Sequence, residues 1–257
     1  MDSFFARGEN VKLGKGALFL DIDGDGYEFI GNANSIALSA DVTTAELFSS
    51  TEEAGSIVDR TRTRIRYTVT PSMNEYTLRN LQLFLAGELG TKNQSSNATD
   101  TFNITDVVLG RYYDVGSRQI AGVSVTKGSN TLTDGTDYEV NAEFGIVHIF
   151  ASATGADDGD DLVVHFATPA KAIKQVNIAV SGQITGKLLY LADDANNSAN
   201  PAKDRLELWK VDIQPDGELN LISDDYGAFS LQMTVLGDST NHPTQPYGTL
   251  DRIAAAF

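Results

Sequence analysis

The segment Phe229-Ser230-Leu231-Gln232-Met233-Thr234-Val235 alternates apolar and polar side chains without exception. Successive side chains of a β-strand point to opposite faces of a sheet, so this pattern predicts a strand with one buried face. A second alternating run covers Ile36–Thr43, and a long strand is predicted over Ile57–Thr70. Further predicted strands cover Gly145–Phe150, Leu162–Ala167, Ile173–Val180 and Arg205–Ile213. Such a series of strands predicts a mainly β fold, built as a β-sandwich or barrel.

One segment breaks this pattern and predicts a single α-helix at about residues 73–87. Pro71 and Ser72 precede it, and Ser72 has the spacing to Glu75 that is typical of a capping box. Gly87 is placed to end the helix. The apolar residues occupy more than one side, so we expect either a deeply buried core helix or a helix at a contact between subunits.

A change of composition divides the chain into a core and an insert. Residues 91–100 are nearly all polar and have the composition of a linker, and Pro169 marks a second break. We therefore expect a discontinuous core, residues 1–100 and 168–257, interrupted by a small β-rich domain at residues 101–167. Surface loops tolerate inserted domains best, which predicts that the insert is displayed on the outer surface.

The composition narrows the possible function classes. With 35 acidic and 19 basic residues, the chain has a formal net charge of −16. This charge argues against binding nucleic acid by neutralising phosphates and against adsorption to anionic lipid. No apolar run approaches the roughly 18 residues that a membrane span requires, and the first residues lack the order of a signal peptide. The absence of cysteine excludes disulfides, iron–sulfur clusters and thiol catalysis.

No motif predicts a catalytic, cofactor or metal site. Asp21–Gly26 resembles the start of a calcium loop, but the twelfth position lacks the bidentate Glu, and a hairpin turn explains the same residues. The acidic clusters at residues 157–161 and 193–194 are interpreted as solvated turns, where a weak cation site stays open. His148 and His165 lie in strand-like runs, and two histidines alone do not form a metal site. We therefore predict a protein that is not an enzyme and uses no cofactor.

The most unusual local pattern is a basic row in this acidic chain. Strand periodicity predicts one shared face for four arginines: Arg60, Arg62, Arg64 and Arg66. One interpretation is a solvated edge strand that uses charge to prevent aggregation. The other is a row that faces carboxylates of another subunit, for which the predicted residues are Glu46, Glu52 and Glu53. Such pairing would offset the repulsion between copies of a chain with a charge of −16.

The order of several segments resembles a known family. These segments are Phe29–Ile36, Glu46–Gly55, Phe84–Gly87, Lys210–Ile213, Leu221–Tyr226, Phe229–Leu231 and Pro246–Gly248. Together they resemble the major tail tube proteins of long-tailed bacteriophages, especially those with flexible, sheathless tails. The likeness covers residues 10–90 and 170–250. The inserted part, with Gly135–Val140 and Gly145, resembles accessory β-modules of such tail proteins.

The resemblance implies a structural virion protein whose subunits form hexameric rings, stacked into a hollow tail tube through which DNA passes. The implied partners are further copies of the chain, the tail-tip and tail-terminator proteins, and the tape-measure protein and DNA, which occupy the lumen in transit only. No membrane binding is implied. The implied location is the virion tail, after assembly in the host bacterial cytoplasm.

In this family the loop between the two long strands reaches the neighbouring ring, which implies that the glutamates and the arginine row meet across a subunit or ring interface. Two other classes stay open. One is a capsid decoration or baseplate-type β-sandwich protein, and the other is a carbohydrate-binding module.

Overall fold

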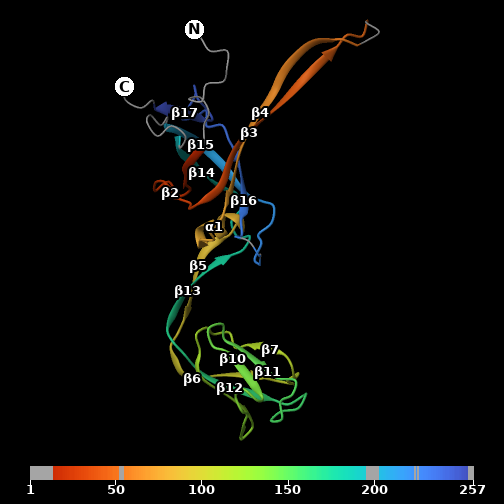
Figure 1. Ribbon diagram of the computed structural model, residues 1–257, viewed down its shortest axis with the longest axis vertical. Helices are drawn as coiled ribbons and strands as arrows, with labels where there is room; N and C mark the ends of the chain where they lie inside the picture. Colours follow the sequence, from red (N-terminus) through yellow and green to blue (C-terminus); the bar gives the residue numbers. More distant parts are fainter. Residues whose placement is uncertain (1–13, 52–54, 195–202, 223, 225, 254–257) are drawn as a thin grey trace. The chain divides into compact units, whose positions relative to one another are not determined.

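The computed structural model describes residues 14–51, 55–194, 203–222, 224 and 226–253 (Figure 1). In these ranges the chain is mainly β with one short helix, which confirms the predicted fold class. It divides into two compact units. Met1–Leu89 with Val176–Phe257 form the first, here called the core unit, and Gly90–Gln175 form the second, here called the inserted unit.

The inserted unit begins earlier and ends later than the predicted insert at residues 101–167. The segment predicted as a linker is not one, because strands β5 (Glu88–Gln94) and β6 (Asn97–Ile104) occupy it. Its polar residues still form strands, since β5 pairs with β13 (Lys171–Asn177) and β6 pairs with β12 (Leu162–Thr168). Linker composition was therefore a misleading signal here.

An eight-stranded sheet forms the core unit. Its strands pair in the order β2–β1–β14–β15–β16–β4–β3. The strand β17 pairs with the first half of β15, and β16 pairs with the second half. The bounds are β1 Gly14–Asp21, β2 Glu28–Phe29, β3 Ala33–Phe48, β4 Ile57–Met73, β14 Ile184–Asp194, β15 Lys203–Asp216, β16 Phe229–Val235 and β17 Gly248–Ile253.

One face of this sheet carries the core. The alternation on β16 buries Phe229, Leu231 and Met233, whereas Gln232 between them is exposed. They pack with buried side chains of the neighbouring strands: Leu18, Leu20, Val69, Met73, Leu188, Leu208, Val211 and Ile213. The helix α1 (Leu78–Phe84) contacts β15 and β16 and places Leu83 in this core.

The helix is shorter than the predicted 73–87, because Pro71, Ser72 and Met73 continue β4 and pair with β3. Thr77 is the N-cap in place of Ser72, and its side chain accepts a hydrogen bond from the backbone N–H of Asn80 (3.1 Å). The predicted capping box is therefore wrong.

The helix is also more exposed than the first of the two expectations requires. It buries Asn80 and Leu83 but leaves Leu78 exposed, so it is not a deeply buried core helix. One side of the helix packs on the sheet and the other side faces solvent.

Besides the pair β5–β13, which spans both boundaries of the inserted unit, this unit contains two sheets, with strand orders β6–β12–β8–β9 and β10–β11–β7. The remaining bounds are β7 Tyr112–Asp114, β8 Ala121–Lys127, β9 Asn130–Thr131, β10 Tyr138–Asn141 and β11 Ile146–Ile149. Buried residues of both sheets, including Val125, Val147 and Val164, belong to one apolar cluster. The inserted unit therefore has a hydrophobic core of its own.

Candidate interaction surface

The long hairpin β3–β4 extends beyond the rest of the core-unit sheet (Figure 1). β4 pairs with β3 along almost its whole length, but with β16 only between Thr68 and Met73. In the described part of the chain, residues 57–67 therefore have β3 as their only neighbouring strand, and β3 is itself the edge of the sheet. We call residues 40–48 and 57–67 the arm. Strand edges without a neighbour can pair with another chain.

The arm and its base have one apolar and one polar face, since residues paired across an antiparallel ladder share a face. The apolar face consists of Leu38, Ala40, Val42, Ile65 and Tyr67. The polar face consists of Ser39, Asp41, Thr43, Arg64, Arg66 and Thr68. Leu38 lies opposite Val69, which is buried in the core, so the apolar face continues the core face of the sheet. Leu38 and Val42 are nevertheless exposed, by 53% and 42%.

A β-bulge divides the arginine row between the two faces. β4 has one extra residue, Thr63, between the pairs Thr43–Arg64 and Thr44–Arg62. Thr43 and Thr44 are consecutive and point to opposite faces, so Arg64 and Arg62 do the same. The predicted single row is therefore wrong. Arg64 and Arg66 lie on the polar face, whereas Arg60 and Arg62 follow the apolar residues on the other face.

The structure pairs one predicted glutamate with the row inside the same chain. Glu46 lies opposite Arg60, and its Oε1 is 3.3 Å from the Arg60 Nε. The Arg60 side chain is largely exposed, so this pair contributes only about 0.2–1 kcal/mol to stability. Glu52 and Glu53 lie outside the described residues, and their contact with the row stays a prediction.

The other three arginines form no ion pair with any residue that the structure describes: Arg62, Arg64 and Arg66. Their charges are exposed in a chain that is otherwise strongly acidic. The arm can therefore offer positive charge to a partner on either face.

An apolar groove of about 310 Å³ lies at the base of the arm. Two residues of the hairpin, Leu38 and Tyr67, form one side of this groove. Its other lining residues include Leu206 of β15, Tyr247 and Leu250. The rings of Tyr67 and Tyr247 are in contact, with centroids 5.6 Å apart. The exposed apolar surface thus continues from the arm across to β15 and β17. A contiguous apolar surface of this kind is typical of surfaces that contact another macromolecule.

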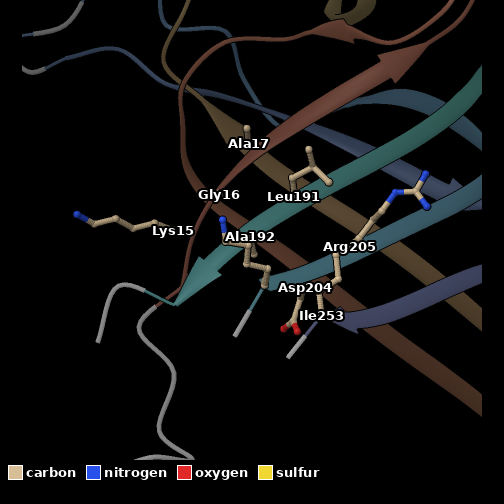
Figure 2. Close-up of a pocket in the computed structure, with 9 residues that line it drawn as sticks. Lys15, Gly16, Ala17, Leu191, Ala192, Asp204, Arg205 and Ile253 are labelled. Carbon is tan, nitrogen blue, oxygen red and sulfur yellow. The ribbon is translucent and has the colours of Figure 1, made fainter. Parts of the chain in front are cut away.

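A second cavity, of about 450 Å³, lies near the ends of β1, β14, β15 and β17 (Figure 2). Asp204 is buried there, but its two carboxylate oxygens accept hydrogen bonds from the Arg252 Nε (2.9 Å) and Nη2 (3.2 Å). Figure 2 shows the side chains of Lys15 and Arg205 extending in opposite directions. Among the residues that the structure describes, polar groups do not converge in this cavity as they do in a ligand site, so the arm is the stronger candidate.

A hydrogen-bonded network beside this cavity is structural. The Tyr27 hydroxyl donates to the Glu207 Oε1 (2.8 Å), and Glu207 also pairs with Arg205 (2.6 Å). Burial and the hydrogen bond to Glu207 raise the pKa of Tyr27 to about 12. The phenol therefore stays protonated near neutral pH and acts as a fixed donor.

The motifs that resembled metal or histidine sites form local structure. Asp21–Gly26 joins the antiparallel strands β1 and β2, which confirms the hairpin turn, and the Asp21 Oδ1 accepts the N–H of Gly24 (2.8 Å). His148 lies on β11 and His165 on β12, in strands as predicted. Within the described ranges, His, Cys, Asp and Glu side chains form no group of three that could hold a metal ion. No helix in those ranges is long and apolar enough to cross a membrane.

Sequence reasoning missed one exposed apolar element, the loop between β15 and β16. Leu221, Ile222 and Tyr226 are 83%, 96% and 98% exposed. The sequence does indicate this apolar loop, because large apolar residues lie in an otherwise polar and acidic stretch between two strands. Large apolar side chains that face solvent so completely are candidates for a contact with another chain.

Comparison with protein families places the chain in one of them. Residues 13–253 match the model of the family described as "Protein of unknown function UCP028589". The match covers nearly the whole chain, and the chain belongs to this family. No curated protein matches the sequence. The family description assigns no activity.

Proposed function

We propose that this protein is a structural virion subunit that self-assembles into hexameric rings, which stack to form the hollow tail tube of a long-tailed bacteriophage. The observation that carries the proposal is the arm. It is an amphipathic two-stranded ribbon whose apolar face is exposed and whose edges have no neighbouring strand in the described chain. A monomer gains nothing from such a ribbon, which invites pairing with other chains.

A closed ring is the arrangement that removes these liabilities. A contact between two different surfaces of identical copies generates either a ring or an open filament, depending on whether the rotation closes. Closure leaves no free strand edge within the ring. Rings that stack through the arm then also cover its apolar face.

The face of the sheet opposite the core supports a role as a channel wall. One row across five strands on this face is entirely polar: Thr185, Asp212, Thr234, Thr68 and Ser39. Arg64 and Arg66 lie on the same face farther along β4, so the repulsion of phosphate rests on the charge of −16 that the chain carries as a whole. A polar wall that repels phosphate lets DNA pass without adhering.

The remaining parts of the proposal follow from the resemblance to tail tube proteins. The partners are further copies of the chain, the tail-tip and tail-terminator proteins, and the tape-measure protein and DNA in transit. The protein resides in the virion tail after assembly in the host cytoplasm. It performs no catalysis, uses no cofactor and does not itself bind membrane.

Electron microscopy and light scattering over a wide range of concentration test this proposal. We expect the full chain to form rings or tubes, and the double variant Val42→Asp with Ile65→Asp to form no tubes and to stop at single rings or smaller species. Both side chains are on the exposed apolar face of the arm, so the variant keeps the circular dichroism spectrum of the parent.

The matched control is Phe144→Asp, which places the same charge at an exposed apolar position of the inserted unit. This variant should assemble like the parent. A parent chain that is monomeric at every concentration, even with the tail-tip proteins present, would overturn the proposed function.

A further inference from the structure

The exposed loop between β15 and β16 is built to stand away from its own chain. Leu219, near its beginning, packs against the core, whereas Leu221, Ile222 and Tyr226 face solvent. We call these three residues the loop tip. Residues 217–228 include three acidic residues and no basic one. The loop tip is therefore an apolar projection with negative charge around it.

The loop and the arm lie at opposite ends of the same strand direction (Figure 1). The loop leaves the sheet at Asp216, which pairs with Ser230, and Ser230 pairs with Ser72 at the end of β4. Ile65 on the apolar face of the arm is seven residues away along β4. At about 3.3 Å per residue this is a distance of about 23 Å. Neither surface covers the other within one chain, since both are exposed.

The two surfaces are complementary in chemistry. The apolar face of the arm offers Val42 and Ile65, and Arg62 follows them on the same face. Arg62 has no ion-pair partner among the described residues. The loop tip offers two aliphatic side chains, and Asp224 follows them in an exposed position. In a contact between the two surfaces, the aliphatic side chains of the loop tip would pack on those of the arm, and Arg62 would lie beside the carboxylate of Asp224.

We propose that the loop tip of one copy binds the apolar face of the arm of a second copy, with Leu221 and Ile222 on Val42 and Ile65 and Asp224 beside Arg62. The contact joins two different surfaces at opposite ends of the sheet, so it repeats head to tail along the strand direction. This inference rests on the proposed self-assembly and identifies the surface that covers the arm. In a stacked tube it is the contact between successive rings.

Site-specific cross-linking tests the contact, because the chain has no cysteine of its own. Two single-cysteine variants, Ile222→Cys and Ile65→Cys, are mixed and treated with a short thiol-reactive bifunctional reagent. We expect the mixed dimer to form at least about tenfold faster than in a mixture of Ile222→Cys with Thr43→Cys, because a bound contact raises the effective concentration of the two thiols. Thr43 is the matched control, since it is exposed on the polar face of the same arm.

A second experiment tests the contact without a cross-linking reagent. Ile222→Asp changes a residue that is 96% exposed, so the chain stays folded, and we expect loss of tubes with retained thermal stability. Equal cross-linking of Ile65→Cys and Thr43→Cys, in a chain that still forms tubes, would overturn this inference alone. A parent chain that forms no assembly at all would overturn the proposed function instead.

Discussion

Asp137 shows how one buried carboxylate organises the inserted unit. Its oxygens accept hydrogen bonds from the backbone N–H groups of Thr133 (2.8 Å), Thr154 (2.8 Å) and Gly155 (3.0 Å). These bonds favour the ionised form and hold the pKa of Asp137 below its ordinary value. A folded-state pKa that is lowered stabilises the fold above the unfolded-state pKa, and this contribution disappears as the pH falls toward the folded value.

We therefore expect Asp137→Asn to lower the melting temperature of the inserted unit at pH 7. We also expect this melting temperature to decrease less in the variant than in the parent as the pH falls. In the parent the melting temperature should fall as the pH drops below about 4, near the ordinary carboxyl pKa. Part of that fall remains in the variant, because a hydrogen bond to Arg118 lowers the pKa of Asp114 and one to Lys127 lowers the pKa of Asp160. Calorimetry between pH 3 and pH 7 measures both effects, and Glu143→Gln at an exposed position is the control. An unchanged acid dependence in Asp137→Asn would contradict this account.

Asn80 links the helix to the first hairpin of the core unit. It is 1% exposed, and its Nδ2 donates to the carbonyl oxygens of Ile30 (2.8 Å) and Glu75 (2.9 Å). Asn80→Ala removes both donors, and a buried carbonyl left without a partner costs about 1–3 kcal/mol. Urea unfolding should show a loss of this size, while Gln232→Ala on the exposed face of β16 should change the free energy of unfolding by less than about 0.5 kcal/mol.

Among the elements of the fold, helix α1 ends differently from what the sequence predicted. Gly87 was expected to end the helix, but Ala86 adopts the left-handed conformation, with φ of 46°. Gly87 is needed for a different reason, because a Cβ there would lie 2.5 Å from the carbonyl oxygen of Asn177. The backbone N–H of Gly87 donates to the carbonyl of Gln82 (2.9 Å) and closes the helix end.

These two adjacent positions should respond in opposite directions. Ala86→Gly removes a side chain from a left-handed residue and should stabilise the core unit, by at most about 1–2 kcal/mol. Gly87→Ala should destabilise it, because the neighbouring backbone must move. Urea unfolding of the two single variants measures the difference, and a stabilised Gly87→Ala variant would contradict the close contact.

The bulge in β4 gives the arginines of the arm two separate roles to test. Arg62→Glu places a negative charge beside the apolar face and should abolish tube formation, whereas Arg66→Glu on the polar face should leave it nearly unchanged. Electron microscopy of both variants measures the outcome.

Rescue of Arg62→Glu by Asp224→Arg would support the loop contact, and rescue by Glu52→Arg with Glu53→Arg would instead support the pairing expected from the sequence. Equal effects of Arg62→Glu and Arg66→Glu would contradict the division of the row.

At the scale of the whole molecule, the inserted unit has its own core and can be removed at a defined place. The ends of β5 and β13 are close together, since the Gln94 Nε2 donates to the carbonyl of Pro169 (3.0 Å). Replacing residues 95–170 with a short Gly/Ser bridge should leave the core unit folded and able to assemble, because a short surface loop closes at small cost. Calorimetry and electron microscopy check this. Loss of folding in the deletion would show that the core unit depends on the insert.

The class of the fold and most of its strands follow from local patterns in the sequence. Alternation with period two is a local property, because each side chain faces the core or solvent according to its own place in the strand. For this reason the strand beginning at Phe229, the hairpin turn at Asp21–Gly26 and the strand positions of both histidines were predictable. The resemblance to tail tube proteins rested on the order of such local segments.

Which surfaces remain uncovered depends on contacts between segments that are distant in the chain. The bulge at Thr63 moves half of the arginine row to the other face, and it is visible only in the pairing of β4 with β3. The start of α1 at Leu78 depends on Met73 pairing in the sheet, which no local capping pattern reveals. Val69 and Val42 look alike in the sequence, yet one is buried and the other exposed, because β16 and the core cover the base of the hairpin and end before the arm. Burial is a property of neighbours distant in the chain, and the sequence of one strand does not contain them.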